Sequence, residues 1–219
     1  MRDLKIKICG MRDRGNISDV AALHPDFLGF IFYPPSSRFC GSIDPEVVRI
    51  IPEGITPVAV VVNPTEEEII ALNNRYGFTT FQLHGEESPE FCKALKDMGF
   101  NVIKAISIKD QESLDCIAGY KGMVDLLVLD TATSSRGGSG KKFDWQLLSD
   151  PAIEIDFLLS GGIGPDDAAA IRSLSLPHLA GIDLNSRFEV SPALKDPELL
   201  QVFLNELDQS KNYDLPSEG

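Results

Sequence analysis

Two residues that could move protons stand at the ends of short apolar segments of the 219-residue chain. Cys9 ends the segment Leu4–Cys9, and Asp130 ends Leu126–Asp130. An unperturbed thiol is only about 3% ionised at pH 7, so a base at Cys9 needs a neighbouring cation or dipole to lower its pKa. Cys9 is followed by Gly10, which leaves space above the sulfur. The two positions favour a reactive thiol and a carboxylic acid, and therefore acid–base chemistry.

A glycine-rich turn is the strongest local motif. The run Ser160–Gly164 precedes Pro165, a residue suited to the first position of a helix. Glycines there let backbone N–H groups approach an anion, and a helix N-terminus adds about half a positive charge. The segment Asn185–Arg187 could complete the cradle from its side. The motif predicts a phosphate site, and the alternative is a turn that needs glycine only for its positive φ.

Two further side chains are candidates for holding a ligand. Arg38 lies on a proline-stiffened loop, and its planar guanidinium would suit a carboxylate, although a surface arginine is the alternative. His84 follows Gln82-Leu83 and is either a hydrogen-bonding residue of the site or a core histidine. The other two histidines lie away from strand ends, so no metal site is expected.

The segment Thr131–Lys142 is rich in serine and glycine and long for a connection in a compact domain. It includes Gly137–Lys141 but lacks the spacing of a nucleotide-binding P-loop, which requires a glycine where Ser135 stands. We interpret the segment as a flap over a bound phosphosugar, with a plain linker as the alternative.

The elements that must position these residues alternate along the whole chain. Short β-branched runs, spaced by about 25 residues, are separated by amphipathic helical stretches. Several runs are apolar without alternation, which is typical of strands buried on both faces of a parallel sheet. The expected strands are Leu4–Cys9, Phe27–Tyr33, Val58–Val62, Thr80–His84, Val102–Ser107, Leu126–Asp130, Phe157–Ser160 and Ala180–Leu184.

Helix start signals support the same organisation. Capping residues precede prolines at Asp44, Ser88, Gly164 and Asp196, and Thr65 with Glu68 forms a capping box. Eight such units without a break in composition predict an α/β fold, a single-domain (β/α)8 TIM barrel over residues 1–208. A doubly wound sheet is the alternative. Residues 209–219 are polar, and we expect a flexible tail.

Composition excludes several classes of function. The chain carries 20 Lys+Arg against 33 Asp+Glu, a formal charge of −13, which argues against a nucleic-acid partner. No apolar run is long enough to span a membrane, and no secretion signal is expected at the N-terminus. The four cysteines form no C-x-x-C pair, so free thiols in a cytoplasmic protein are expected.

A series of different short motifs runs from the first expected strand to about residue 195. They are Lys7–Gly10, Gly29–Phe32, Ser36–Phe39, Gln82–Gly85, Leu129–Thr131, Gly138–Gly140, Ser160–Ile163, Gly181–Asp183, Asn185-Ser186 and Glu189. Together they resemble the phosphoribosylanthranilate isomerase family of tryptophan biosynthesis. The glycine turn alone would fit many phosphate-binding barrels, but the full series is specific.

The resemblance implies an Amadori rearrangement, the third step of the anthranilate-to-tryptophan branch. N-(5-phosphoribosyl)anthranilate becomes 1-(2-carboxyphenylamino)-1-deoxyribulose 5-phosphate, with no cofactor and no metal. Cys9 matches the general base, Asp130 the general acid, and Arg38 the residue that holds the anthranilate carboxylate. The assigned substrate-binding residues are Arg38, Gln82, His84 and Asp183, and the assigned phosphate-binding residues are Gly140, Gly161, Gly162, Asn185 and Ser186.

The chain departs from the family pattern at one point, since Arg187-Phe188 follows Ser186 where a small residue is common. Two alternatives stay open. Another phosphosugar barrel, such as a metal-dependent epimerase or the next synthase of the pathway, would need several histidines or catalytic lysines at strand ends, and the nearest such lysine, Lys104, lies inside a strand. A non-catalytic phosphosugar-binding module would not need both Cys9 and Asp130. The expected partner is a small phosphosugar, and the expected state is a monomer or homodimer.

Overall fold

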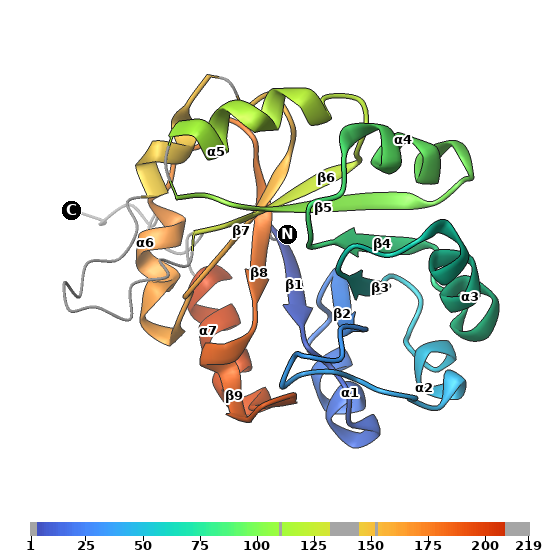
Figure 1. Ribbon diagram of the computed structural model, residues 1–219. Helices are drawn as coiled ribbons and strands as arrows, with labels where there is room; N and C mark the ends of the chain where they lie inside the picture. The colour runs from blue at the N-terminus through green and yellow to red at the C-terminus, as the bar shows by residue number, and fades with distance from the viewer. Residues whose placement is uncertain (1–3, 110, 132–144, 152, 209–219) are drawn as a thin grey trace, which may run out of the picture.

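Eight parallel strands pair in sequence order and close into a barrel (Figure 1). The computed structural model describes residues 4–109, 111–131, 145–151 and 153–208. The ring closes where β1 pairs with β8, with Lys7 opposite Asp183. The strands are β1 Lys5–Cys9, β2 Phe27–Ile31, β3 Thr56–Val61, β4 Thr80–Leu83, β5 Asn101–Ser107, β6 Leu126–Asp130, β7 Phe157–Ser160 and β8 Leu179–Leu184. The predicted (β/α)8 class is confirmed.

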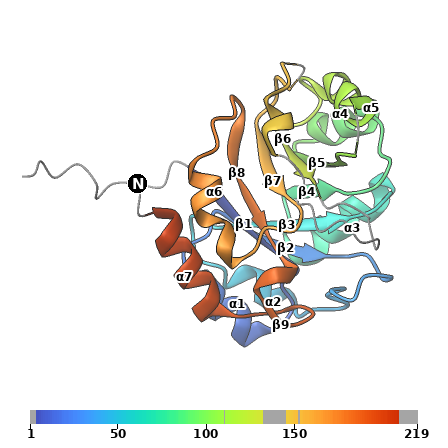
Figure 2. The ribbon, with the colours of Figure 1, turned by 90° about the vertical axis from the view of Figure 1, so that its left-hand side faces the viewer.

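Helices surround the strands on the outside of the barrel (Figures 1 and 2). The α-helices are α1 Arg14–Ala21, α2 Pro45–Arg49, α3 Glu66–Tyr76, α4 Pro89–Asp97, α5 Gln111–Asp115, α6 Ala168–Arg172 and α7 Pro197–Asp208. Short 3-10 helices are η1 Cys116–Tyr120, η2 Trp145–Ser149, η3 Pro165–Asp167 and η4 Ser186–Phe188. Each βα connection therefore delivers its loop to the same end of the barrel.

The predicted helix caps form at Asp44, Thr65, Ser88 and Asp196, whereas Gly164 precedes the 3-10 helix η3 without a side-chain cap. The Thr65 hydroxyl accepts from the Glu68 N–H, and the Glu68 carboxylate accepts from the Thr65 N–H, which completes the capping box. Between β6 and β7 the sequence led us to expect an α-helix, but the described residues form only η2. Pro151 follows η2 and disfavours helical geometry in the residue before it, so the turn ends at Ser149.

Two apolar layers explain the strands that lack alternation. In β3, Val58 and Val60 belong to the cluster inside the barrel, whereas Ala59 and Val61 belong to the cluster beneath the helices. Both faces are therefore buried, as the continuous apolar runs predict. The interior cluster reaches Cys9 at the carboxyl end of β1. It provides a rigid floor for the residues above it.

A small antiparallel hairpin, which the sequence did not predict, follows β8. Its strands are β9 Glu189–Ser191 and β10 Leu194–Lys195. The α1 residue Asn16 holds the backbone of Lys195 with two hydrogen bonds, at 2.9 and 2.8 Å. The hairpin turn contains Ala193 at φ +66°, a conformation in which glycine is usual. With alanine there and very short strands, no hairpin signal is visible in the sequence.

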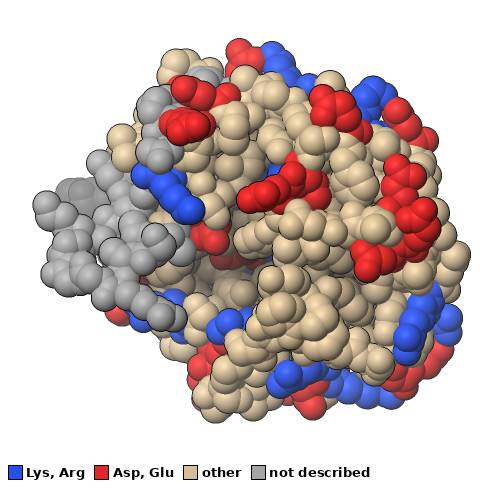
Figure 3. Space-filling view, in the orientation of Figure 1, with Lys and Arg blue, Asp and Glu red and all other residues tan. Residues whose placement is uncertain are grey.

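The distribution of basic side chains on the surface agrees with the acidic composition of the chain. On the face drawn in Figure 3, the Lys and Arg residues described by the structure are scattered among Asp and Glu rather than gathered into a band. Among the described residues, no helix is both long enough and apolar enough to cross a membrane.

Candidate active site

One cavity of about 180 Å³ opens where the carboxyl ends of the strands converge. It collects side chains from strands that are far apart in sequence, and both Cys9 and Asp130 line it. The other predicted site residues in its wall are Gln82, His84, Gly161, Gly162, Asp183, Asn185 and Ser186. The apolar part of the wall comes from Ile31, Val60 and Ile163. Strand-end position thus brings the predicted residues together.

Cys9 is buried at the end of β1, with only 4% of its surface exposed. It lies opposite Gly29 of β2 in the strand register. A Cβ added at Gly29 would stand 2.8 Å from the Cys9 sulfur, closer than real atoms approach. The absence of a side chain at position 29 therefore makes the space in which the thiol sits.

Charged groups surround the thiol. Burial raises the pKa of Cys9, and the Asp183 carboxylate raises it further, whereas the Lys7 and Lys195 ammonium groups lower it. Lys7 Nζ donates to Asp183 Oδ1 at 2.9 Å, so its ammonium group is held where its charge acts on the thiol. The two lysines partly offset burial, but the resulting pKa of Cys9 stays above its ordinary value. The sequence-based requirement for nearby cations is met, although their effect is smaller than that of burial.

Asp130 faces the cavity from β6, three strands away from β1 around the ring. It is half-buried, and its backbone carbonyl accepts from Ile108 at 2.9 Å. In the strand register it lies beside Ser160, the residue that begins the glycine turn. The carboxyl group is therefore held by β6 on one side of the cavity, while the thiol is held by β1 on another.

Gln82 and His84 form a pair at the end of β4. Gln82 Nε2 lies 3.3 Å from His84 Nδ1, and Gln82 Oε1 is buried without a hydrogen-bond partner among the described residues. The surrounding cavity wall lowers the pKa of His84, while Asp130 and Asp183 oppose that effect. His84 keeps an exposed surface at the mouth of the cavity, so it is not a core histidine. The pair presents an unsatisfied acceptor and a neutral imidazole to any ligand there.

The glycine turn has the backbone that its sequence predicts. Gly161 and Gly162 both adopt positive φ, at +97° and +68°, where a side chain would be strained. Asn185 and Ser186 approach the same cavity from the end of β8. Arg187 is exposed and lies beside Gly164 of the turn. The departure from the family pattern at Arg187 thus adds a cation at the outer side of the two loops.

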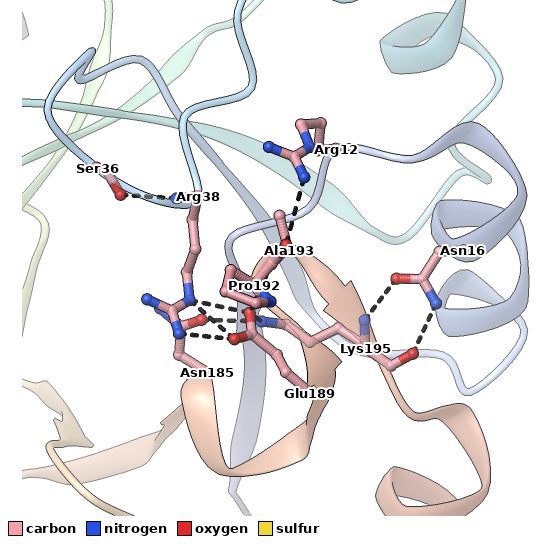
Figure 4. Close-up of polar contacts among 9 residues, drawn as sticks. All are labelled: Arg12, Asn16, Ser36, Arg38, Asn185, Glu189, Pro192, Ala193 and Lys195. Atoms are coloured by element: carbon pink, nitrogen blue, oxygen red, sulfur yellow. Dashed lines mark hydrogen bonds and ion pairs between the residues drawn. The ribbon is translucent and has the colours of Figure 1, made fainter.

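Arg38 does not line the cavity itself but lies beside its rim, where Figure 4 shows it paired with Glu189. Its guanidinium contacts both oxygens of that carboxylate, at 2.7 to 3.0 Å. Gly10, with φ +84°, permits this approach, because a Cβ there would lie 3.0 Å from both Arg38 Cδ and Asn185 Oδ1. Gly140 and most of the predicted flap 131–142 lie outside the described residues.

Sequence reasoning gave no role to three charged residues that the structure brings to this site: Lys7, Glu189 and Lys195. The side chains of the two lysines have no exposed surface, and that of Glu189 is only 4% exposed. One signal was visible, since Lys7 interrupts the apolar run of β1 between two isoleucines. A lysine in a strand that is buried on both faces must have a partner. Glu189 and Lys195 lie on the unpredicted hairpin; Glu189 is one of the residues of the family resemblance, but without a role, and Lys195 carried no comparable signal.

In the described ranges, no group of three or more His, Cys, Asp or Glu side chains could hold a metal ion. The four cysteines form no disulfide, and Cys116 is exposed while Cys9, Cys40 and Cys92 are buried.

Known proteins resemble the chain over almost its full length. The family model described as N-(5'phosphoribosyl)anthranilate (PRA) isomerase matches residues 6–206. N-(5'-phosphoribosyl)anthranilate isomerase of Parabacteroides distasonis is 44% identical over 92% of this chain and 92% of its own length. The enzyme of Phocaeicola vulgatus is 41% identical, with 93% of this chain and 98% of its own length covered.

Solved structures are also similar to the chain over most of its length. Phosphoribosyl anthranilate isomerase from Thermotoga maritima is 30% identical, with a TM-score of 0.80 over 93% of this chain and 98% of that one. A second isomerase structure, in complex with reduced 1-(o-carboxyphenylamino)-1-deoxyribulose 5-phosphate, is 26% identical with a TM-score of 0.76 over the same shares. The barrel, the strand-end cavity and these similarities lead to one conclusion: the chain belongs to the N-(5'-phosphoribosyl)anthranilate isomerase family, enzymes of tryptophan biosynthesis.

Proposed function

We propose that the chain catalyses the Amadori rearrangement of N-(5-phosphoribosyl)anthranilate to 1-(2-carboxyphenylamino)-1-deoxyribulose 5-phosphate, the third step of the anthranilate-to-tryptophan branch. Cys9 is the general base and Asp130 the general acid. The observation that carries this proposal is that the two side chains line one cavity from different sides of the barrel. A small sugar bound between them would meet an acid and a base at once.

The steps follow from these two roles. Asp130 donates a proton to the ribose ring oxygen, the C1′–O bond breaks, and the nitrogen lone pair forms a protonated Schiff base at C1′. The Cys9 thiolate removes the C2′ proton, and that electron pair forms the C1′=C2′ bond of a neutral enolamine. The enolamine gains a proton at C1′ and loses one from the C2′ hydroxyl, which gives the ketone. No electrons leave the substrate, so the reaction needs no redox cofactor.

The remaining assignments place the rest of the substrate. Gly161 and Gly162 on one loop, with Asn185 and Ser186 on the next, bind the phosphate together with Gly140. Arg38 holds the anthranilate carboxylate beside the rim. Gln82 Oε1 accepts a hydrogen bond from a substrate hydroxyl or amine, because this buried oxygen has no partner among the described residues. His84 and Asp183 contact the sugar from the same wall.

The direct test mixes the purified protein with freshly made phosphoribosylanthranilate and follows the decay of substrate fluorescence. Decay faster than the spontaneous rate supports the proposal, and a rate equal to the control without enzyme contradicts it.

Arg38→Ala should mainly raise KM, so an unchanged KM would contradict the carboxylate role. Activity should survive exhaustive chelation. A loss that zinc or iron restores would favour the epimerase alternative instead.

We further propose that the enzyme acts in the cytoplasm, as a monomer or homodimer. The free cysteines support a reducing compartment, since no pair forms a disulfide. One related structure is of monomers generated from the dimeric phosphoribosylanthranilate isomerase of Thermotoga maritima. Sedimentation equilibrium of the purified chain distinguishes the two states, and a larger assembly would contradict both.

A further inference from the structure

A compact ionic cluster stands beside the cavity and joins elements that are distant in sequence (Figure 4). Arg38 comes from the loop after β2, Glu189 from β9, Lys195 from β10 and Asn185 from the end of β8. Lys195 Nζ donates to Glu189 Oε1 at 2.6 Å and to Asn185 Oδ1 at 2.8 Å. One carboxylate is therefore shared by two cations, and the second cation also contacts a residue of the cavity wall.

Glu189 occupies one particular edge of the Arg38 guanidinium. Nε and Nη2 donate to the carboxylate, at 2.9 and 2.7 Å, whereas Nη1 has no hydrogen-bond partner among the described residues. A guanidinium is a flat fork with a fixed pattern of donors, so fixing one edge also fixes the direction of the other. The Nη1 side of Arg38 is thus set in place and keeps a donor for an incoming anion.

Burial distinguishes the two partners. The Arg38 side chain keeps 23% of its surface exposed, while the Glu189 side chain keeps 4%. Arg38 can therefore reach a ligand at the rim, but Glu189 lies behind it. Burial raises the pKa of Glu189, yet the hydrogen bonds from Arg38 and Lys195 more than offset this, so the group stays ionised at neutral pH.

The charges show why the carboxylate is needed. Two cations and one anion leave the cluster with a net positive charge beside the cavity. Burial lowers the pKa of Lys195, and the charge of Arg38 lowers it further, while Glu189 raises it. Without the carboxylate, the Arg38 guanidinium would face Lys195 with no anion between them and would be repelled from its present position.

We propose that Glu189 is a positioning residue, which holds Arg38 in the orientation that receives the carboxylate of the anthranilate ring. The inference rests on the proposed function, because it takes the role of Arg38 from there. Lys195 anchors Glu189 from the opposite side and is itself fixed through Asn16 of α1. Glu189 does not touch the substrate and acts only through Arg38.

A purely structural role must be separated from this one, because Glu189 Oε1 also accepts from the Ala193 N–H within the hairpin, at 3.2 Å. Two ligands, used as binding probes, distinguish a positioning role of Glu189 from a purely structural one. The first is reduced 1-(o-carboxyphenylamino)-1-deoxyribulose 5-phosphate, and the second is the same compound with a phenyl ring that lacks the carboxylate. Both carry the same sugar phosphate, so the ratio of their dissociation constants reports only on the carboxylate.

The variant Glu189→Gln should weaken binding of the carboxylated probe about tenfold, the typical contribution of a charge-assisted hydrogen bond, and should leave the other probe within about twofold. KM should rise with little change in kcat. Glu46→Gln, which breaks an exposed pair with Arg49 on α2, is the matched control and should change neither constant. An equal loss for both probes, or no loss for either, would overturn the proposal.

Two more variants keep the result decisive. If Glu189→Gln does not fold, Glu189→Asp retains the charge but shortens the side chain, and an unchanged probe ratio in that variant would overturn the proposal. Arg38→Met must itself abolish the preference for the carboxylated probe. If it does not, the proposed role of Arg38 fails and this inference with it. If Arg38→Met abolishes the preference for the carboxylated probe while Glu189→Gln keeps it, only the inference about Glu189 fails.

Discussion

Two buried lysines, Lys7 of β1 and Lys104 of β5, serve the barrel in different ways. Their exposed fractions are 0% and 2%, and each binds a carboxylate at 2.9 Å. Lys7 shares the barrel interior with Cys9, and its partner Asp183 lines the cavity. Lys104 lies between two interior residues of β5 and therefore points outward, toward Glu87 in the loop after β4. The same chemical pair thus occurs on opposite faces of the sheet.

The partners of each lysine show the difference. Lys104 donates to the carbonyls of Gly85 and Ala105 as well as to Glu87, and Glu87 in turn accepts from the backbone of Asn63 and Gly85. These bonds tie the loops after β3 and β4 together. Lys7 instead donates to Asp183, and its charge acts on the Cys9 thiol. A buried ion satisfied by backbone stabilises the fold, whereas one paired with a group that must change its protonation can tune chemistry.

The largest predicted effect is the loss of stability in Lys104→Met, because this variant leaves the Glu87 carboxylate buried without its counterion. The free energy of unfolding should fall by about 3–5 kcal/mol, the usual cost of breaking a buried pair from one side. The kcat of the folded enzyme should change little, because Lys104 does not line the cavity. Urea denaturation and steady-state kinetics on the same preparation provide both numbers. A stable variant with low kcat would reverse the roles we assign to the two lysines.

The second-largest effect, a loss of turnover, is expected when either of the two proposed catalytic residues is replaced. Cys9→Ser or Asp130→Asn should lower turnover at least roughly a hundredfold, or about 2.7 kcal/mol, through the loss of acid–base catalysis. The unfolding free energy should change much less than for Lys104→Met, since each substitution retains the shape of the side chain. Near wild-type turnover in both variants would reject the mechanism.

Lys7→Met should have an intermediate effect on catalysis. Lys7 lowers the pKa of Cys9, so its removal raises that pKa further and leaves less thiolate at neutral pH. The acid limb of the kcat/KM profile should move to higher pH, with a loss of about tenfold, or 1.4 kcal/mol, at pH 7 for a shift of one unit. The cost in stability should be smaller than for Lys104→Met, because Asp183 lies at the cavity and can be hydrated.

A second measurement reports on the thiol without any substrate. The rate of Cys9 alkylation by iodoacetamide against pH follows thiolate formation directly, with the modified site identified by mass spectrometry. The exposed Cys116 must first be replaced, so Cys116→Ser serves as the background for both forms. An alkylation profile that Lys7→Met leaves unmoved would show that Lys7 does not act on Cys9.

The smallest effect is expected for an exposed pair. Lys93 and Asp97 lie one turn apart on α4, with about half or more of each side chain in solvent. Lys93→Met should change the unfolding free energy by less than about 0.5 kcal/mol and leave kinetics unchanged, because water and salt screen such pairs. A loss comparable with that of Lys104→Met would show that burial does not separate the ion pairs as we argue.

Much of this architecture could be predicted from sequence, because local patterns determine it. The unalternating run at Val58–Val62 predicts a strand buried on both faces, and the capping box at Thr65 predicts where α3 begins. Strand-end position was enough to select most of the cavity wall, since all parallel strands of a barrel deliver their carboxyl ends to one side.

Other features depend on contacts between distant segments, which local patterns do not report. Glu189 acquires its role only when the loop after β2 brings Arg38 beside it, 151 residues away. The hairpin that carries Glu189 has strands too short, and a turn too unusual at Ala193, to be recognised from sequence. Likewise, the space around the Cys9 sulfur depends on Gly29 of a neighbouring strand, a dependence that only the register reveals.

The junction of β1 with β8 has a consequence for how the enzyme is built. Lys7 and Asp183 are 176 residues apart, and they meet only where the first and last strands of the ring pair. A chain that lacks β8 would hold the Lys7 ammonium group without its counterion, and the Cys9 thiol without its full set of neighbours. Closure of the ring and completion of the surroundings of the base therefore depend on the same strand, and a chain cut before β8 would lack both.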